Sequence, residues 1–251
     1  MAVQLMERTA LDRLKRILPT DEDPTPMSLP TELFLIAHDD DTGNQHVNEK
    51  TLHRGLAAAV LLELWLTKRV RIGWQDNVRE GVLTRDPGRI TIMNDDATGD
   101  RITDTALTLL SQSGGTLRLH DFVQQFADTG LYQRVQADLV AAGIIHHTTR
   151  KRFWSFRRRL AYVPTRRAYP VRARGRIRRM LDHYRAGTQR PDPRALALSA
   201  LVTTLRLTPH LYQRDIDPGH LHHWQKHLLE QQTDPTIRDI TATITNYKAP
   251  I

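Results

Sequence analysis

Hydrophobic positions recur with the helical period of about 3.6 residues along most of this chain. The clearest case is Leu52–Val70, where apolar side chains occupy most faces and predict a central, buried helix. Thr31–Ala37 predicts a helix start or a buried apolar segment. Further helices are predicted at Met1–Leu18, Asp100–Leu110, Leu117–Phe126, Leu131–Ala142, Val171–Tyr184, Ala195–Leu205, Leu221–Leu229 and Ile237–Ile244. The pattern therefore predicts a mainly α fold, a single-domain helical bundle with amphipathic outer helices and short β-hairpins.

Two places interrupt the helical pattern with strand-like sequence. Ile144–Arg152 and Phe156–Tyr162 are rich in β-branched and aromatic residues and predict a hairpin that projects from the helical body. A second hairpin is predicted to turn at Pro87-Gly88, between the short apolar segments Leu83–Thr84 and Ile90–Ile92.

The chain of 251 residues is long enough for one large domain or two small ones. Residues 1–26 are interpreted as an amphipathic helix followed by a proline-rich, acidic linker, and residues 27–251 as the helical domain, with the basic hairpin at 143–170. The absence of cysteine excludes disulfides, thiolate metal sites and a cysteine nucleophile. No run approaches the roughly 20 apolar residues that a membrane span needs, so any membrane contact is expected to be peripheral.

Positive charge is concentrated in Arg150–Arg185, which we call the basic arm. It holds 14 of the 36 Lys and Arg residues but one of the 28 acidic residues, so the remainder has 22 basic against 27 acidic residues, a net of −5. An arm of about +13 on a mildly acidic body is expected to bind a polyanion. The residues predicted to contact a membrane or to build an oligomer at the hairpin are Arg152, Phe153, Trp154, Phe156, Arg157, Arg158 and Arg159.

The aromatic residues within the arm leave three interpretations open. Trp and Tyr beside Arg suit a membrane–water interface, where the cation meets lipid phosphate. They also suit stacking on bases next to nucleic-acid phosphates. In the third interpretation the aromatic side chains pack on the body and the arginines are simply solvated.

Motifs for catalysis and metal binding are weak. Asp39-Asp40-Asp41-Thr42-Gly43 contains the Asp-Thr-Gly of aspartic proteases, but a second carboxylate partner is missing, and the phosphatase and calcium-loop patterns fail at Gly43 and Lys50. A turn, with glycine supplying positive φ, is favoured instead. His223 and His227 share a helix face without a third ligand at motif spacing, which favours a surface helix rich in histidine. We therefore predict a protein without enzymatic activity and without a cofactor or metal.

Three stretches taken together are similar to a known family. They are Leu33–Ile36 through Asp41-Thr42-Gly43 to Gly55–Leu64; Leu83-Thr84 with Ala97–Asp100 and Ala106-Leu107; and Asp138–Val140 with Gly143–Ile145 and Pro191–Arg194. Their order and spacing resemble the Golgi phosphoprotein 3 family, whose bacterial members occur in actinobacteria, from Met27 to the C-terminus. The resemblance implies a mostly helical domain and a cytosolic protein that binds membranes peripherally through phosphatidylinositol 4-phosphate. It also implies adaptor work on glycosyltransferase tails and self-association through the hairpin.

The family's lipid-headgroup pocket uses a Trp and an Arg near the central helix and two basic residues on a later helix. By spacing, these four positions fall at Asn48, Ala57, Thr129 and Tyr132. Lys50 and Arg54 share a helix face with Ala57 and would restore positive charge, whereas Arg134 is expected to point elsewhere. The sequence thus predicts a weak, unselective anion site at these seven residues, with Arg54 as the principal contact.

The leading hypothesis is a non-enzymatic, cytoplasmic protein associated peripherally with the membrane, which binds anionic phospholipid and acts as an adaptor for a protein client. The second is a nucleic-acid-binding protein that uses Arg150–Arg185, and it ranks lower because no nucleic-acid-binding fold is recognised. The third is a structural protein that forms homo-oligomers through the hairpin, its arginines facing acidic patches of a neighbouring copy.

Overall fold

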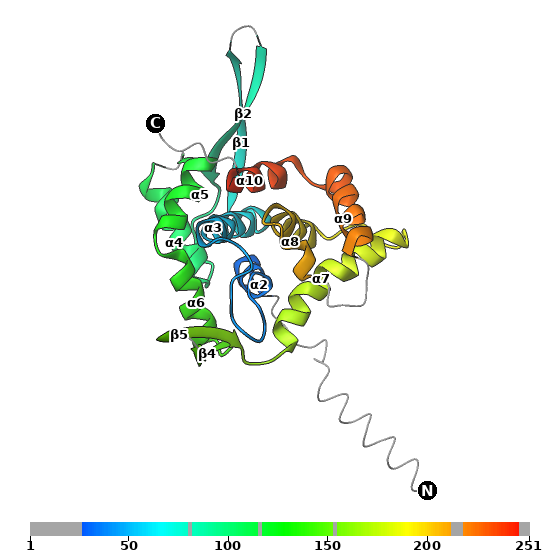
Figure 1. The fold of residues 1–251 in the computed structure, drawn as a ribbon. Coiled ribbons are helices and arrows are strands. Elements are labelled where there is room, and N and C mark those ends of the chain that lie inside the picture. Colours follow the sequence, from blue (N-terminus) through cyan, green and yellow to red (C-terminus); the bar gives the residue numbers. More distant parts are fainter. Residues whose placement is uncertain (1–26, 80–81, 115–116, 153–154, 212–217, 246–251) are drawn as a thin grey trace, which may run out of the picture.

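Helix α3 (Glu49–Leu66) runs through the middle of the molecule, as the hydrophobic pattern predicts (Figure 1). The computed structural model describes residues 27–79, 82–114, 117–152, 155–211 and 218–245. Asn48 caps α3, because its side chain accepts a hydrogen bond from the backbone N–H of Lys50. The helix ends four residues before the predicted Val70, since Lys68 adopts the left-handed conformation with φ 58°.

The other helices surround α3 and confirm a mostly helical fold (Figure 1). Their bounds are α2 Leu29–Ile36, α4 Arg101–Gln112, α5 Leu119–Asp128, α6 Leu131–Ala141, α7 Ala168–Arg185, α8 Pro193–Thr204, α9 Pro218–Gln232 and α10 Pro235–Thr245, with a short 3-10 turn at Thr208–His210. Helices α2, α5, α8 and α10 all pack against α3, which accounts for its burial on most sides. The predicted helix within residues 1–26 lies outside the described residues.

Strands β1 (Val70–Arg79) and β2 (Val82–Ile92) form an antiparallel pair that extends beyond the helical body in Figure 1. The turn predicted at Pro87-Gly88 is wrong, because both residues lie inside β2. Proline is tolerated there because β3 (Leu117–Arg118) pairs with only Arg89 and Ile90 of β2, so Pro87 has a neighbouring strand on one side only. On that side, the pairing of β1 with β2 is irregular between Ile72 and Trp74 of β1.

The strands β4 (Ile145–Arg152) and β5 (Ser155–Pro164) pair antiparallel, in agreement with the strand pairing predicted for this segment. Arg152 lies in β4, and β5 contains Phe156, Arg157, Arg158 and Arg159. Phe153 and Trp154 lie outside the described residues. The basic and aromatic character of this hairpin's surface, and its contact with a membrane or another copy, stay predictions.

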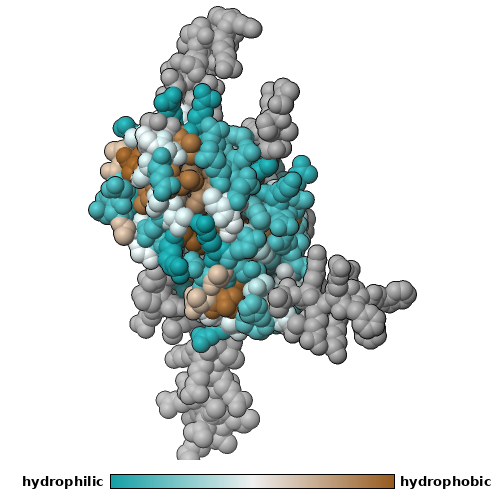
Figure 2. Space-filling view, turned by 90° about the vertical axis from the view of Figure 1, so that its left-hand side faces the viewer, coloured by the Kyte–Doolittle hydropathy of each residue, from teal (hydrophilic) through white to brown (hydrophobic). Residues whose placement is uncertain are grey.

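The face that carries α4, α5 and α6 is mostly hydrophilic, and its apolar residues form small, separate patches (Figure 2). Among the described residues, the exposed large hydrophobic side chains are Met93 and Val171. None of the helices in the described ranges is both long and apolar enough to cross a membrane.

Candidate anion-binding site

The loop before α3 is held by a turn at Asp39–Gly43, as predicted. The Asp39 carboxylate accepts hydrogen bonds from the backbone N–H and the hydroxyl of Thr42, at 2.7 and 2.6 Å. Gly43 has φ +66°, and a Cβ there would lie 2.6 Å from the Tyr162 carbonyl oxygen of β5. The Asp-Thr-Gly sequence is therefore a close-packed turn that fixes the loop between α2 and α3 against the β4–β5 hairpin.

The four positions that correspond to the family's headgroup pocket have different surroundings. Asn48 is exposed at the start of α3, whereas Ala57 has no exposed surface. Thr129 ends α5, and its hydroxyl donates to the Phe126 carbonyl oxygen at 2.7 Å. Tyr132 is half-buried in the first turn of α6. Because Ala57 lies entirely in the core, no ligand can reach that position.

Tyr132 of α6 belongs to a cluster of aromatic rings with Phe34 of α2, His38 in the segment after α2, and His53 of α3. The Tyr132 ring centroid lies 5.2 Å from that of His53 and 5.4 Å from that of Phe34. The His38 Nδ1–H donates to the Phe34 carbonyl oxygen at 2.7 Å, which leaves Nε2 to accept from the Tyr132 hydroxyl at 3.0 Å. Burial lowers the pKa of His38 to about 4, so the His38 imidazole is neutral near pH 7.

Arg54 faces a different space, a pocket of about 460 Å³ where the start of α3 meets the C-terminal ends of α8 and α10. We call it the helix-end pocket; it is lined by His46, Val47, Asn48, Thr51, Arg54, Thr204, Leu205, Arg206, Ile244 and Thr245. Among the described residues, the lining contains two arginines, one histidine, three threonines and one asparagine, and no carboxylate. Such a lining attracts an anion and offers it several hydrogen-bond donors.

His46 stacks on His210 at the edge of this pocket, with ring centroids 3.6 Å apart. Burial lowers the pKa of both imidazoles, and His210 lowers that of His46 further, whereas Asp39 has the opposite effect on both. The Asp40 carboxylate also raises the pKa of His46, but it is engaged in a two-pronged ion pair with Arg174, with both N–O distances 2.7 Å.

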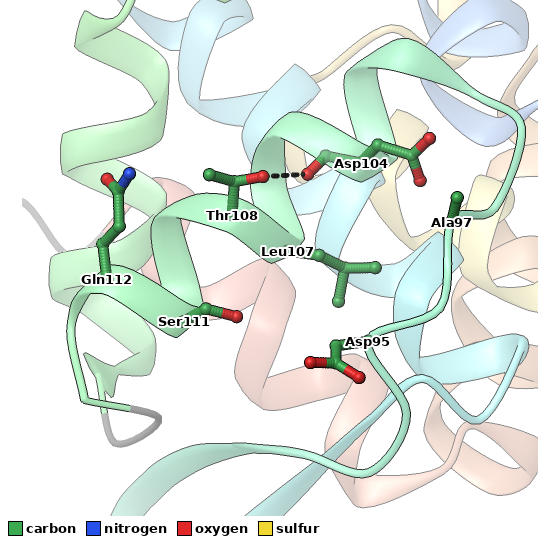
Figure 3. Close-up of a pocket in the computed structure, with 7 residues that line it drawn as sticks. All are labelled: Asp95, Ala97, Asp104, Leu107, Thr108, Ser111 and Gln112. Atoms are coloured by element: carbon green, nitrogen blue, oxygen red, sulfur yellow. Dashed lines mark hydrogen bonds between the residues drawn. The ribbon is translucent and has the colours of Figure 1, made fainter.

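Another pocket, of about 330 Å³, has the opposite character (Figure 3). It lies along α4 and the segment before it, and its lining, as far as the chain is described, includes the carboxylates of Asp95 and Asp104 and no cation. Asp104 accepts hydrogen bonds from the backbone N–H and the hydroxyl of Thr98, both at 2.7 Å, which lower its pKa against the effect of burial. This pocket holds a carboxylate that closes the turn into α4, and it would repel an anion.

The basic arm is partly used to attach α7 to the body. Arg174 pairs with Asp40, and Arg176 donates to the buried carboxylate of Glu32 at 2.8 Å. These two positive charges are therefore paired with carboxylates of the body. The net charge that the arm presents to solvent is smaller than the sum of its charged residues. Within the described ranges, no group of three His, Cys, Asp or Glu side chains is arranged to hold a metal ion.

The structure thus brings together two of the seven predicted anion-site residues, Asn48 and Arg54, in one pocket. Lys50 and Arg134 are exposed and do not line it. Sequence reasoning missed Thr204, Arg206 and Thr245, because the ends of α8 and α10 are about 150 to 190 positions from Arg54 in the chain. It also assigned no role to His46 and Thr51, although both lie close to Arg54 in the sequence. The role of Asn48 and Arg54 in anion binding stays a prediction.

The sequence model of Golgi phosphoprotein 3 (GPP34) matches residues 29–244, which run from the start of α2 almost to the end of α10. No curated protein matches the chain. The matched range includes α3, both hairpins and every residue that lines the helix-end pocket except Thr245. By this match, the chain belongs to the Golgi phosphoprotein 3 family.

Proposed function

We propose that this protein is a non-enzymatic peripheral membrane protein that binds anionic phospholipid. Membership of the Golgi phosphoprotein 3 family is consistent with lipid binding. The observation that carries the proposal is the helix-end pocket, whose described lining contains Arg54, Arg206 and His46 and no acidic side chain. Guanidinium groups bind phosphate through charge-assisted hydrogen bonds, so this lining suits a lipid headgroup.

Helix α7 supplies a second contribution. Arg178, Arg179 and Arg185 are exposed on it, and Val171 is 59% exposed near its start. Each Lys or Arg near an anionic surface contributes about 1 kcal/mol, so a few exposed arginines hold a protein at a membrane without a specific pocket. Together with the hairpin, α7 would provide a broad electrostatic contact while the pocket binds one headgroup.

The test is cosedimentation with vesicles of neutral phosphatidylcholine and with vesicles that also contain phosphatidylserine. We expect binding to the anionic vesicles alone, and we expect Arg54→Ala to weaken it several-fold. Arg134→Ala is the matched control, because it removes an exposed arginine that does not line the pocket. Equal binding to both vesicle types, or equal losses in the two variants, would contradict the proposal.

Adaptor activity and self-association belong to the same proposal. Family membership supports both, and the pairing of β4 with β5 provides the hairpin through which copies would associate. Nucleic-acid binding is the weaker alternative, because Arg174 and Arg176 of the arm are engaged with carboxylates of the body.

A further inference from the structure

Helix α9 contains a group of histidines that the proposed membrane function does not use. They are His220, His222, His223 and His227, on a helix that packs against α7 and α8 at the edge of the molecule (Figure 1). His222 and His223 are exposed, and His227 is half-buried. Histidine is the side chain that most often binds metals in proteins, so the arrangement of these rings decides whether an ion can bind there.

His223 and His227 share one face of α9. They are four positions apart, and side chains at that spacing are neighbours on a helix, with Cβ atoms about 5–6 Å apart. A separate observation agrees, because both imidazoles lie beside the indole of Trp224, with ring centroids 6.4 and 6.1 Å away. His222 has Lys226 at the corresponding position of the next turn. The pair of His223 and His227 can therefore offer two nitrogen donors to one ion.

We infer that His223 and His227 form a binding site for a divalent transition-metal ion of the zinc and copper class. Two histidines at this spacing on a helix bind one zinc ion in the metalloprotease motif. Such ions accept imidazole nitrogen, whereas Mg²⁺ and Ca²⁺ take oxygen ligands. Since no group of three His, Cys, Asp or Glu side chains is arranged to hold a metal in the described ranges, the remaining coordination positions are open to water.

Contacts around the pair restrain its rings. The indole of Trp224 stacks on the imidazole of His227 with 14° between the ring planes, and the Arg185 guanidinium of α7 lies 5.8 Å from the centroid of that indole. Rings that are already restrained lose less freedom when an ion binds. The ammonium of Lys226 next to the pair lies 3.8 Å from the Glu230 carboxylate, which offsets part of its positive charge.

The experiment is calorimetric titration of the full chain, made without a histidine tag, with Zn²⁺ and with Mg²⁺. We expect Zn²⁺ to bind and Mg²⁺ not to bind, because the ligands are nitrogen atoms. His223→Gln and His227→Gln should each weaken Zn²⁺ binding by about tenfold or more, since a single protein ligand remains. His222→Gln is the matched control, because it removes an exposed histidine of the same helix and leaves the pair intact.

The fluorescence of Trp224 shows where the ion binds. Cu²⁺ binds the same nitrogen ligands more tightly than Zn²⁺, and a bound Cu²⁺ quenches the emission of an indole beside it. The chain has 4 tryptophans, so we expect Cu²⁺ to quench part of the total emission. That part should disappear in Trp224→Phe, which keeps both histidines and should still bind Zn²⁺ in the calorimeter.

Several results would overturn the inference. They are an absence of Zn²⁺ binding, Mg²⁺ binding as tight as that of Zn²⁺, and Cu²⁺ quenching that is unchanged in Trp224→Phe. Equal losses of Zn²⁺ affinity in His222→Gln and His223→Gln would also overturn it, because the ion would then bind the histidine-rich helix without using the pair. Failure here leaves the membrane proposal intact, since neither His223 nor His227 lines the helix-end pocket.

Discussion

Among the described residues, His38 is the histidine that is classed as buried. The residue is 5% exposed, and its ring stacks on that of Phe34 with the centroids 4.1 Å apart. Both ring nitrogens take part in hydrogen bonds. The tautomer with a proton on Nδ1 satisfies the Phe34 carbonyl oxygen and accepts from Tyr132. A second proton would have to displace the Tyr132 hydroxyl as donor, in a place where burial already opposes charge.

We therefore expect acid to destabilise the fold through His38. Its pKa is about 4 in the folded state against an ordinary value of 6.5, so the unfolded chain takes up the proton first as pH falls. The stabilisation is complete above pH 6.5 and declines toward pH 4 by about 3 kcal/mol. Urea unfolding at several pH values should show a smaller decline in His38→Phe, and an identical decline in both proteins would refute the assignment.

At the residue scale, helical spacing in the sequence correctly predicted which residues near the start of α3 lie together. Asn48 and Arg54 were expected together, and they line one pocket because both belong to the start of α3. Ala57 was expected on the same face, but α3 is buried on most sides, so a residue one turn further on lies in the core. The position of Arg206 in the pocket could not be predicted from spacing. No local sequence signal indicates that the end of α8 packs beside Gly55.

At the scale of elements, ion pairs with little exposure connect helices far apart in the chain. The Glu63 carboxylate of α3 accepts from both terminal nitrogens of Arg194 on α8, at 2.8 and 2.7 Å. It also accepts from the backbone N–H of Leu29, and Arg194 donates to the Met27 carbonyl oxygen at 3.0 Å. This group therefore fixes the start of α2 and the start of α8 against the central helix.

Breaking this group from one side should be costly. Arg194→Ala leaves the Glu63 carboxylate, 13% exposed, without its cation, and we expect the free energy of unfolding to fall by about 3–5 kcal/mol. Replacing both partners with methionine should cost less than the single change, because no uncompensated charge remains. Denaturant unfolding of the single and double variants measures the difference, and a double variant less stable than Arg194→Ala would contradict the argument.

The sequence predicted the pairing of β4 with β5 but misplaced the turn between β1 and β2. In the first case a long β-branched and aromatic segment contrasted with helical neighbours. In the second, Pro87-Gly88 is a strong local turn signal, but both residues lie inside β2, which pairs with β1. Proline fits there because β3 does not reach this part of β2, which therefore has a neighbouring strand on one side only. Local signals are reliable where no distant strand competes with them.

At the scale of the whole molecule, the uneven charge should govern membrane binding. The arm's total of about +13 contrasts with −5 for the rest, although Arg174 and Arg176 are neutralised by the body. Interactions of exposed charges are screened within about 8 Å at physiological ionic strength and about 3 Å at 1 M salt. The protein should therefore associate with anionic membranes at low salt and leave them as salt increases.

We expect binding to phosphatidylserine vesicles to fall by more than tenfold between 50 mM and 500 mM salt. Replacing Phe153, Trp154 and Phe156 together by alanine should weaken binding further at unchanged charge, if these aromatic residues enter the interface. Vesicle flotation across a salt series measures both effects. Binding that is insensitive to salt would exclude an electrostatic attachment, and an unaffected triple variant would exclude insertion of the aromatic side chains.

The helix-end pocket joins Arg54, near the start of the described fold, to Thr245 in its last helix. A ribosome adds roughly 5–20 residues per second, so the 191 positions between them take about 10–40 s to make. During that interval α3 is already made, but the part of the pocket lining that α10 contributes, Ile244 and Thr245, is not. The pocket is therefore complete only after α10 has emerged and docked.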